Sequence, residues 1–118
     1  MSQSCSWTGR LVRDVDFRYS TKGDNKPFCF LKLAVPRSYR PKDGKDVKVD
    51  WLEFKCFGDE AEGLMDGVKG QLIEIHGHVE NYTRAKEDGS KEYGHQLIVD
   101  RAWNHSKKKA EDETDREE

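Results

Sequence analysis

Apolar and polar residues alternate along several segments of this chain, and the alternation constrains its fold more than any other feature. Between residues 28 and 35, and again between residues 50 and 57, apolar residues recur at every second position. Successive side chains of a strand point to opposite faces, so this spacing is typical of β-strands. Clusters of Gly, Asp, Asn and Lys separate the alternating segments, as turns do. The pattern therefore predicts an all-β protein.

Five segments are predicted as strands: Cys5–Val12, Phe28–Val35, Asp50–Phe57, Gln71–Arg84 and Tyr93–Trp103. A short helix is predicted after the third strand, because apolar residues recur there at helical spacing. The acidic segment Asp59–Glu62 suits the start of this helix and contains an N-cap candidate. Gly67 and Gly70 can end this helix, and the Asp88-Gly89 step suits a hairpin turn. Five strands with one helix between the third and fourth is the order of an OB-fold barrel, the predicted fold class.

The length of 118 residues, 34% of them hydrophobic, leaves room for one small domain, predicted over residues 1–105. No apolar run approaches the roughly 20 residues that cross a bilayer, and no basic-then-apolar leader opens the sequence, so a cytoplasmic location close to the nucleoid is expected. Cys5, Cys29 and Cys56 lack CxxC spacing, which favours reduced thiols. Cys29 and Cys56 are predicted to lie in the core.

The net charge of −2 averages two regions of opposite sign. Residues 111–118 hold one basic and six acidic side chains, a charge of −5, whereas residues 1–110 hold 20 basic and 17 acidic side chains, a charge of +3. From residue 106 onward the sequence is polar or charged except for alanine, too little apolar surface to fold. Residues 106–118 are therefore predicted to be a disordered, acidic tail.

Six short motifs follow one another along residues 5–103: Gly9–Asp14, Arg18-Tyr19, Leu33–Val35, Trp51–Gly58, Lys69–Gln71 and Asp88-Gly89 with Tyr93. In this order and spacing they resemble the bacterial single-stranded DNA-binding proteins. The resemblance implies an OB fold that binds single-stranded DNA of any sequence and protects it in replication, recombination and repair. It also implies a homotetramer, with a dimer as the alternative.

A protein that accepts any sequence uses the π-face that every base has and the charge that every phosphate carries. The predicted stacking residues are Tyr39, in a basic loop, and Trp51 and Phe57, which share the outward face of the third predicted strand; the resemblance places a stacking aromatic at each. The alternative for Trp51 and Phe57 is packing within the sheet or against a subunit. Predicted phosphate contacts, each with a plain solvated charge as the alternative, are Arg10, Lys32, Arg37, Arg40 and Lys55.

In the hairpin, Arg84 occupies the place of the fourth stacking aromatic of the family. Its guanidinium plane can still stack on a base, and Tyr82 lies two residues away on the same strand face. Both Arg84 and Tyr82 are therefore predicted as stacking residues. The alternative for Arg84 is a solvated side chain. Trp7 and Trp103 are predicted to pack in the core or at its rim, and Tyr19 to anchor a loop. Phe28 and Phe30 either extend the binding path or pack, and are left outside the predicted site.

His76-Gly77-His78 points two imidazoles the same way, with Cys56 or His95 as further candidate ligands, but no CxxC or HExxH spacing accompanies them, so no metal site is predicted. The absence of a GxSxG motif, a P-loop or an oriented Cys-His pair predicts no enzyme and no cofactor.

Two alternative functions stay open. One is an OB-fold primosomal, plasmid or phage replication accessory protein, and the other is a protein-interaction module without a nucleic-acid role.

In the family resembled, a linker leads to acidic residues and a final Pro-Phe that docks partner proteins. Here residues 111–118 keep the acidity without an aromatic anchor. A contact through charge alone is weak at physiological salt, so recruitment of protein partners through this tail is predicted to be absent or reduced. The acidic segment is also suited to compete with DNA for the basic face, with a tail that only aids solubility as the alternative.

Overall fold

The computed structural model describes residues 3–23, 25–38, 42 and 47–106. Its elements are β1 (Cys5–Leu11), β2 (Asp16–Tyr19), β3 (Pro27–Pro36), β4 (Val49–Phe57), α1 (Asp59–Leu64), β5 (Leu72–Ala85) and β6 (Lys91–Asn104). The predicted all-β class and the helix between the third and fourth predicted strands are confirmed. The structure adds β2, which was not among the predicted strands. Its four residues alternate between polar and aromatic, but the strand is short and only Phe17 is half-buried, so it adds little to the core.

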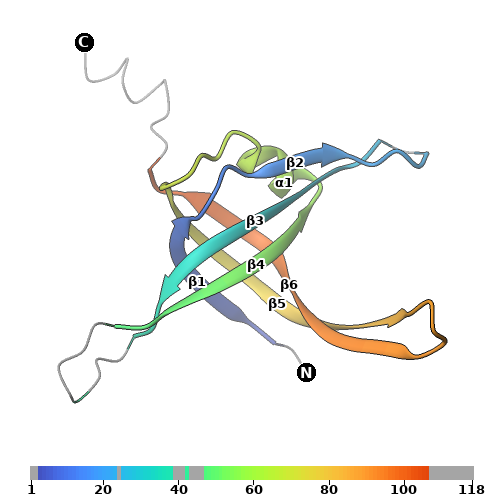
Figure 1. Cartoon of the computed structure of the whole chain (residues 1–118). Coiled ribbons are helices and arrows are strands. Elements are labelled where there is room, and N and C mark those ends of the chain that lie inside the picture. Colours follow the sequence, from blue (N-terminus) through green and yellow to red (C-terminus); the bar gives the residue numbers. More distant parts are fainter. Residues whose placement is uncertain (1–2, 24, 39–41, 43–46, 107–118) are drawn as a thin grey trace, which may run out of the picture.

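The strands form one sheet in the order β1-β5-β6-β4-β3-β2, and β1 also pairs with β3, so the sheet closes into a ring (Figure 1). The β4–β6 pairing is parallel and the others are antiparallel. Closure depends on a close approach at Gly9, where a Cβ atom would overlap the carbonyl oxygen of Ala34. A residue without a side chain is needed at this crossing.

The interior of the ring is filled by inward-facing aliphatic and aromatic side chains, chiefly Leu31, Leu33, Phe54, Ile73 and Ile75. Trp7 packs edge-on against Phe54 with 5.2 Å between ring centroids, which confirms its predicted packing role. Cys29 and Cys56 are fully buried, as predicted, and face each other across β3 and β4. The hydrogen bond with the Cys29 sulfur, together with burial, raises the pKa of the Cys56 thiol, so this thiol stays protonated.

The helix α1 covers one end of the ring and is shorter than predicted. Its N-cap is Gly58, whose carbonyl oxygen accepts from the backbone N–H of Ala61, so the N-cap expected within Asp59–Glu62 is wrong. The helix ends at Leu64 instead of at Gly67 or Gly70. The reason is tertiary, since the carbonyl oxygen of Gly67 accepts from the backbone N–H of Val15 and ties the chain to the turn after β1.

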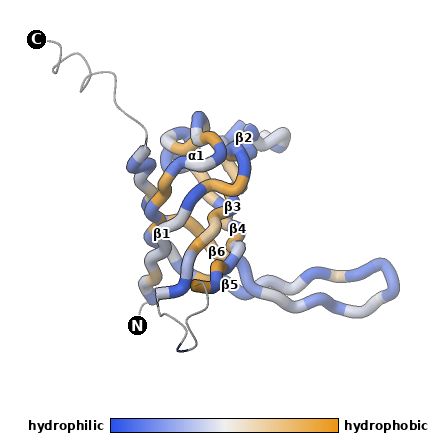
Figure 2. The backbone as a smooth tube through the Cα atoms, turned by 60° about the vertical axis from the view of Figure 1, so that its left-hand side comes forward, coloured by the Kyte–Doolittle hydropathy of each residue, from blue (hydrophilic) through white to orange (hydrophobic). Residues whose placement is uncertain are grey.

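The β5–β6 hairpin projects from the ring as a long arm, which is hydrophilic along most of its length (Figure 2). At its tip Lys86 N donates to the carbonyl oxygen of Ser90 at 2.8 Å, and Gly89 adopts a φ of 87°. The Asp88 carboxylate accepts from the backbone N–H of Ser90 at 3.0 Å. The turn predicted from Asp88-Gly89 is confirmed, because glycine alone adopts this φ without strain.

Candidate nucleic-acid interface

The outward side chains of β3 and β4 form a continuous surface, which we call the β3–β4 face. Its members pair across the strands: Phe28 with Phe57, Phe30 with Lys55, Lys32 with Glu53 and Ala34 with Trp51. Trp51 is 60% exposed and Phe57 is 56% exposed, so the predicted outward placement of both rings is confirmed. They stand at opposite ends of the face, about 20 Å apart at about 3.3 Å per residue of strand.

Arg10 reaches the Trp51 end of the β3–β4 face from β1. It pairs with Ala34, and Ala34 pairs in turn with Trp51. Because neighbouring strands lie about 4.8 Å apart, the backbones of Arg10 and Trp51 are about 10 Å apart on the same outer surface. Nη1 of Arg10 donates to the carbonyl oxygen of Gly70 at 2.9 Å. This bond holds the guanidinium at the segment that precedes β5, while the strand register places the backbone of Arg10 near that of Trp51.

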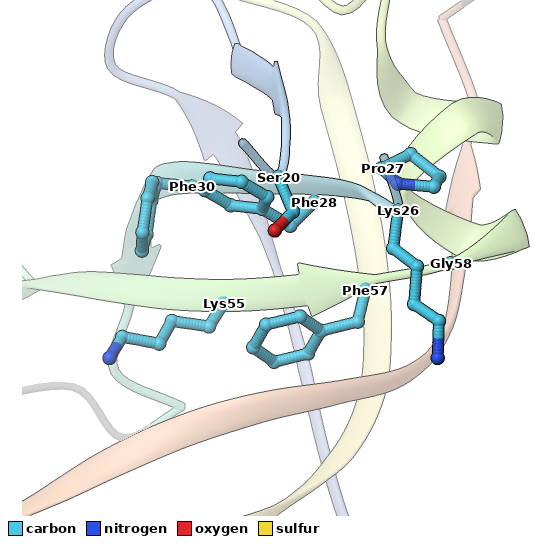
Figure 3. A pocket seen from close by; sticks show the side chains of 8 residues that line it. All are labelled: Ser20, Lys26, Pro27, Phe28, Phe30, Lys55, Phe57 and Gly58. Carbon is cyan, nitrogen blue, oxygen red and sulfur yellow. The ribbon is translucent and has the colours of Figure 1, made fainter. Parts of the chain in front are cut away.

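The Phe57 end of the face opens into a cavity of about 560 Å³, shown in Figure 3. Its lining residues are Ser20, Lys26, Pro27, Phe28, Phe30, Lys55, Phe57 and Gly58. Phe28 and Phe30 are not part of the site predicted from the sequence, yet they line this cavity together with Phe57. The signal that assigns them is the β3–β4 register, which places Phe28 directly opposite Phe57 and which a single sequence does not contain.

The base of the hairpin adjoins the same face through Lys55. A second cavity, of about 180 Å³, is lined by Glu53, Lys55, Tyr82 and Arg84 among others. The guanidinium of Arg84 lies 5.3 Å from the centroid of the Tyr82 ring. The two hairpin residues are thus a cation–π pair beside the β3–β4 face, and Arg84 is not a solitary solvated charge.

The remaining predicted cations have different surroundings. Nε and Nη2 of Arg37 donate to the Asp50 carboxylate at 3.1 and 3.0 Å, and these bonds hold the pKa of Asp50 below its ordinary value. A phosphate would have to share Arg37 with Asp50. Lys32 lies on the β3–β4 face opposite Glu53. Tyr39 and Arg40 lie outside the described residues.

The histidines on β5 face carboxylates. Nε2 of His76 lies 2.8 Å from Glu74, and His78 lies 2.9 Å from Asp100 and 2.7 Å from Glu80. Within the described ranges, no group of three or more His, Cys, Asp or Glu side chains is arranged to hold a metal ion.

Two other aromatics pack away from the β3–β4 face. Trp103 packs edge-on against His76 with 4.8 Å between ring centroids, in agreement with its predicted rim position. Tyr19 packs in the same way against Phe17, with 5.2 Å between centroids. In the part of the chain that the structure describes, no helix is long and apolar enough to cross a membrane.

A closed sheet with an outward face of aromatic and basic side chains matches the class suggested by the motifs: the chain belongs to the single-strand binding protein family, whose sequence model matches residues 3–105. It is 30% identical over 93 residues to the single-stranded DNA-binding protein of Clostridium tetani, covering 78% of this chain and 62% of that protein. It is 30% identical over 93 residues to single-stranded DNA-binding protein 4 of Streptococcus agalactiae, covering 78% and 65%. Single-stranded DNA-binding protein B of Bacillus subtilis is 27% identical over 93 residues, covering 78% and 80%. The chain thus spans slightly less than two thirds of the first two relatives.

Proposed function

We propose that this protein binds single-stranded DNA without sequence preference and protects it during replication, recombination and repair. The observation that carries the proposal is the pair of exposed rings, Trp51 and Phe57, at the two ends of one strand face with Lys55 between them. A row of exposed aromatics flanked by cations is suited to a ligand with flat bases and a charged backbone, as in OB folds that bind single strands. Such a ligand occurs at the nucleoid, so we place the protein in the cytoplasm with it.

In the mechanism we propose, aromatic rings bind the bases and cationic side chains bind the phosphates. Bases stack on Trp51 and Phe57, and phosphates pair with nearby Lys and Arg side chains. The assigned phosphate contacts are Arg10, Lys32, Arg37, Arg40 and Lys55. At Arg37 the phosphate replaces the carboxylate of Asp50 as the hydrogen-bond partner. Tyr82 with Arg84 and Tyr39 are assigned as further stacking groups. None of these contacts reads a base edge, so binding tolerates any sequence.

Titration with oligo-dT tests the proposal through intrinsic fluorescence. Stacking on Trp51 quenches its emission, and Trp51→Ala weakens binding roughly tenfold or more, because a stacked base contributes about 1–3 kcal/mol. Trp103→Phe is the matched control, since Trp103 packs on His76 away from the β3–β4 face, and its affinity stays at the wild-type value. An unchanged emission spectrum with excess oligo-dT, and no mobility shift in gels, would refute the proposal.

The salt dependence of the affinity separates strand binding from a protein-interaction role. Each phosphate neutralised on a single strand contributes about −0.7 to the slope of log affinity against log salt concentration. We expect a clear negative slope, which becomes shallower by about one such increment in Arg10→Ala or Lys55→Ala. A flat plot would favour the protein-interaction module over the strand binder.

We also propose that the protein assembles as a homotetramer, with a dimer as the alternative. Two features of the surface support self-association. Among the described residues, the edge of β1 that faces away from β5 pairs with β3 only at Arg10 and Leu11. Met65 and Val68, beyond the end of α1, are 49% and 47% exposed. An open strand edge and exposed apolar side chains are both surfaces that a second subunit can cover.

A further inference from the structure

The cavity at the Phe57 end of the β3–β4 face has two further aromatic walls, Phe28 and Phe30, that the proposed function does not use. Phe28 and Phe30 are neighbours on the outward face of β3, with ring centroids 5.7 Å apart and an angle of 84° between the rings. Phe57 stands across from Phe28 on β4. Directly opposed residues have Cβ atoms about 4.5–5.5 Å apart, so the three rings converge on one space.

The shape of this cavity suits a flat aromatic group. Its volume of about 560 Å³ lies within the range of small-ligand pockets. Because Phe28 and Phe30 meet edge to face, they do not cover each other by stacking, and ring surface stays available on the cavity side (Figure 3). A planar ligand placed against one of these rings presents its edge to the other, the arrangement that aromatic pairs favour.

The charges around the cavity select an anionic ligand. Lys26 and Lys55 line it from two sides, and among the described residues no Asp or Glu lines it (Figure 3). Nζ of Lys55 lies 5.9 Å from the centroid of the Phe30 ring and donates to Oε1 of Gln96 at 2.8 Å. One hydrogen bond leaves two of the three ammonium donors of Lys55 for a ligand.

Polar groups able to identify a base are scarce in the cavity. The hydroxyl of Ser20 is engaged locally, since its Oγ accepts from the backbone N–H of Lys22 at 3.3 Å. The other neutral lining side chains are proline and phenylalanine. A base that enters this space is therefore held by its π-face and its phosphate and not by its edge.

We propose that Phe28, Phe30 and Phe57 form a base-binding subsite for a nucleotide of the same DNA strand that stacks on Trp51. The inference rests on the function proposed above and deepens it. Continuity supports this occupant, because Phe57 and Lys55 belong both to the cavity and to the β3–β4 face. The strand follows β4 from Trp51 to Phe57 and ends this path against Phe30 and Phe28.

Substitution of Phe30 tests the subsite. Phe30→Ala weakens binding of a long oligo-dT about tenfold, and Phe30→Leu, which keeps apolar volume but has no π-face, also weakens it several-fold. Tyr19→Ala is the matched control, because Tyr19 is 53% exposed and in an edge-on aromatic pair but does not line the cavity. Its affinity stays at the wild-type value. Circular dichroism of each variant verifies the fold.

Three outcomes separate this inference from the proposed function. If the wild-type protein does not bind oligo-dT, both the proposed function and the subsite are refuted. Normal wild-type binding that Trp51→Ala weakens, with Phe30→Ala and Phe30→Leu both binding as wild type, refutes the subsite alone. A lower mass of Phe30→Ala by light scattering, with unchanged DNA affinity, also refutes the subsite and assigns the cavity to a second copy of the chain.

Photo-cross-linking gives a readout that does not depend on a substitution. Oligo-dT carrying a single 5-iodouracil is irradiated in complex with the wild-type protein, and the adduct is mapped by mass spectrometry. We expect cross-links at Phe28 or Phe30 for some positions of the probe and at Trp51 for others. Cross-links at Trp51 for every probe position, and never at the cavity, would overturn the subsite.

Discussion

His78 is held between two carboxylates. Nδ1 lies 2.9 Å from Asp100 and Nε2 lies 2.7 Å from Glu80. These hydrogen bonds, with the Asp100 bond the larger influence, raise the pKa of His78 above its ordinary value of 6.5. A raised folded-state pKa means that the protonated imidazole stabilises the folded protein. This contribution is complete below about pH 6.5 and is lost as the pH rises through the raised pKa.

We therefore expect the melting temperature to fall as the pH rises above about 6.5, in part through His78. An NMR titration should show His78 with a pKa above 6.5, and Asp100→Asn should lower that pKa and flatten the pH dependence of melting. A His78 pKa at or below 6.5 in the wild type would contradict the expectation.

At the scale of single residues, the sequence predicted which face of a strand a side chain occupies better than it predicted which residues that side chain contacts. Alternation along one strand is local, so the outward positions of Trp51 and Phe57 could be predicted from period two alone. Partners come from other strands. The bidentate hydrogen bonds of Arg37 with Asp50, and the position of Phe28 opposite Phe57, depend on how two segments align, and nothing in either segment alone specifies that register.

At the scale of strands and helices, Gly77 marks an irregular point in the long hairpin. The β5–β6 register shifts between His76 and Gly77, and Gly77 is buried. A Cβ atom at Gly77 would overlap the carbonyl oxygen of Ile98, which is backbone and has no rotamer to change. The two strands approach closely here because position 77 has no side chain.

Gly77→Ala is therefore expected to lower the free energy of unfolding by about 1–3 kcal/mol, or to prevent folding. Gly63→Ala is the control, since a Cβ atom at Gly63, within α1, meets nothing within 4 Å. It should be neutral or stabilise the protein by up to about 1 kcal/mol, because alanine favours helix more than glycine. Urea denaturation monitored by tryptophan fluorescence measures both. Equal stabilities of Gly77→Ala and wild type would show that the strands separate there without cost.

The elements themselves were predicted with uneven success for a physical reason. The long strands carry several inward apolar residues each, so their pattern survives in a single sequence. Within the described residues, β2 is a four-residue strand that pairs only with β3, and its alternation is too short to stand out, with Phe17 as its single half-buried residue. The helix was predicted too long, because its end is set by the bond from Val15 to Gly67, between segments far apart in the sequence.

At the scale of the whole molecule, the prediction concerns assembly. Multi-angle light scattering at micromolar concentration should give a mass near four times the 13.7 kDa chain. If the open edge of β1 joins subunits, Ser6→Pro should reduce this mass, because proline removes a backbone donor from β1. Thr21→Pro, at an exposed position outside the strands, is the control. A monomer at micromolar concentration would refute the homotetramer and favour the accessory-factor alternative.

The opposed charges of the two parts of the chain lead to the last prediction. Residues 111–118 carry −5 and residues 1–110 carry +3, so the acidic segment has the sign needed to compete with DNA phosphates for the basic side chains. A competition through charge alone is screened beyond about 8 Å at physiological salt and weakens further above it. We expect deletion of residues 111–118 to tighten oligo-dT binding at low salt and to change it little at high salt. The matched control keeps the length and replaces the six acidic residues of this segment by Asn or Gln, which should tighten low-salt binding as the deletion does. Low-salt affinity that is unchanged or weaker in both variants would contradict masking and would leave the segment with a role in solubility alone.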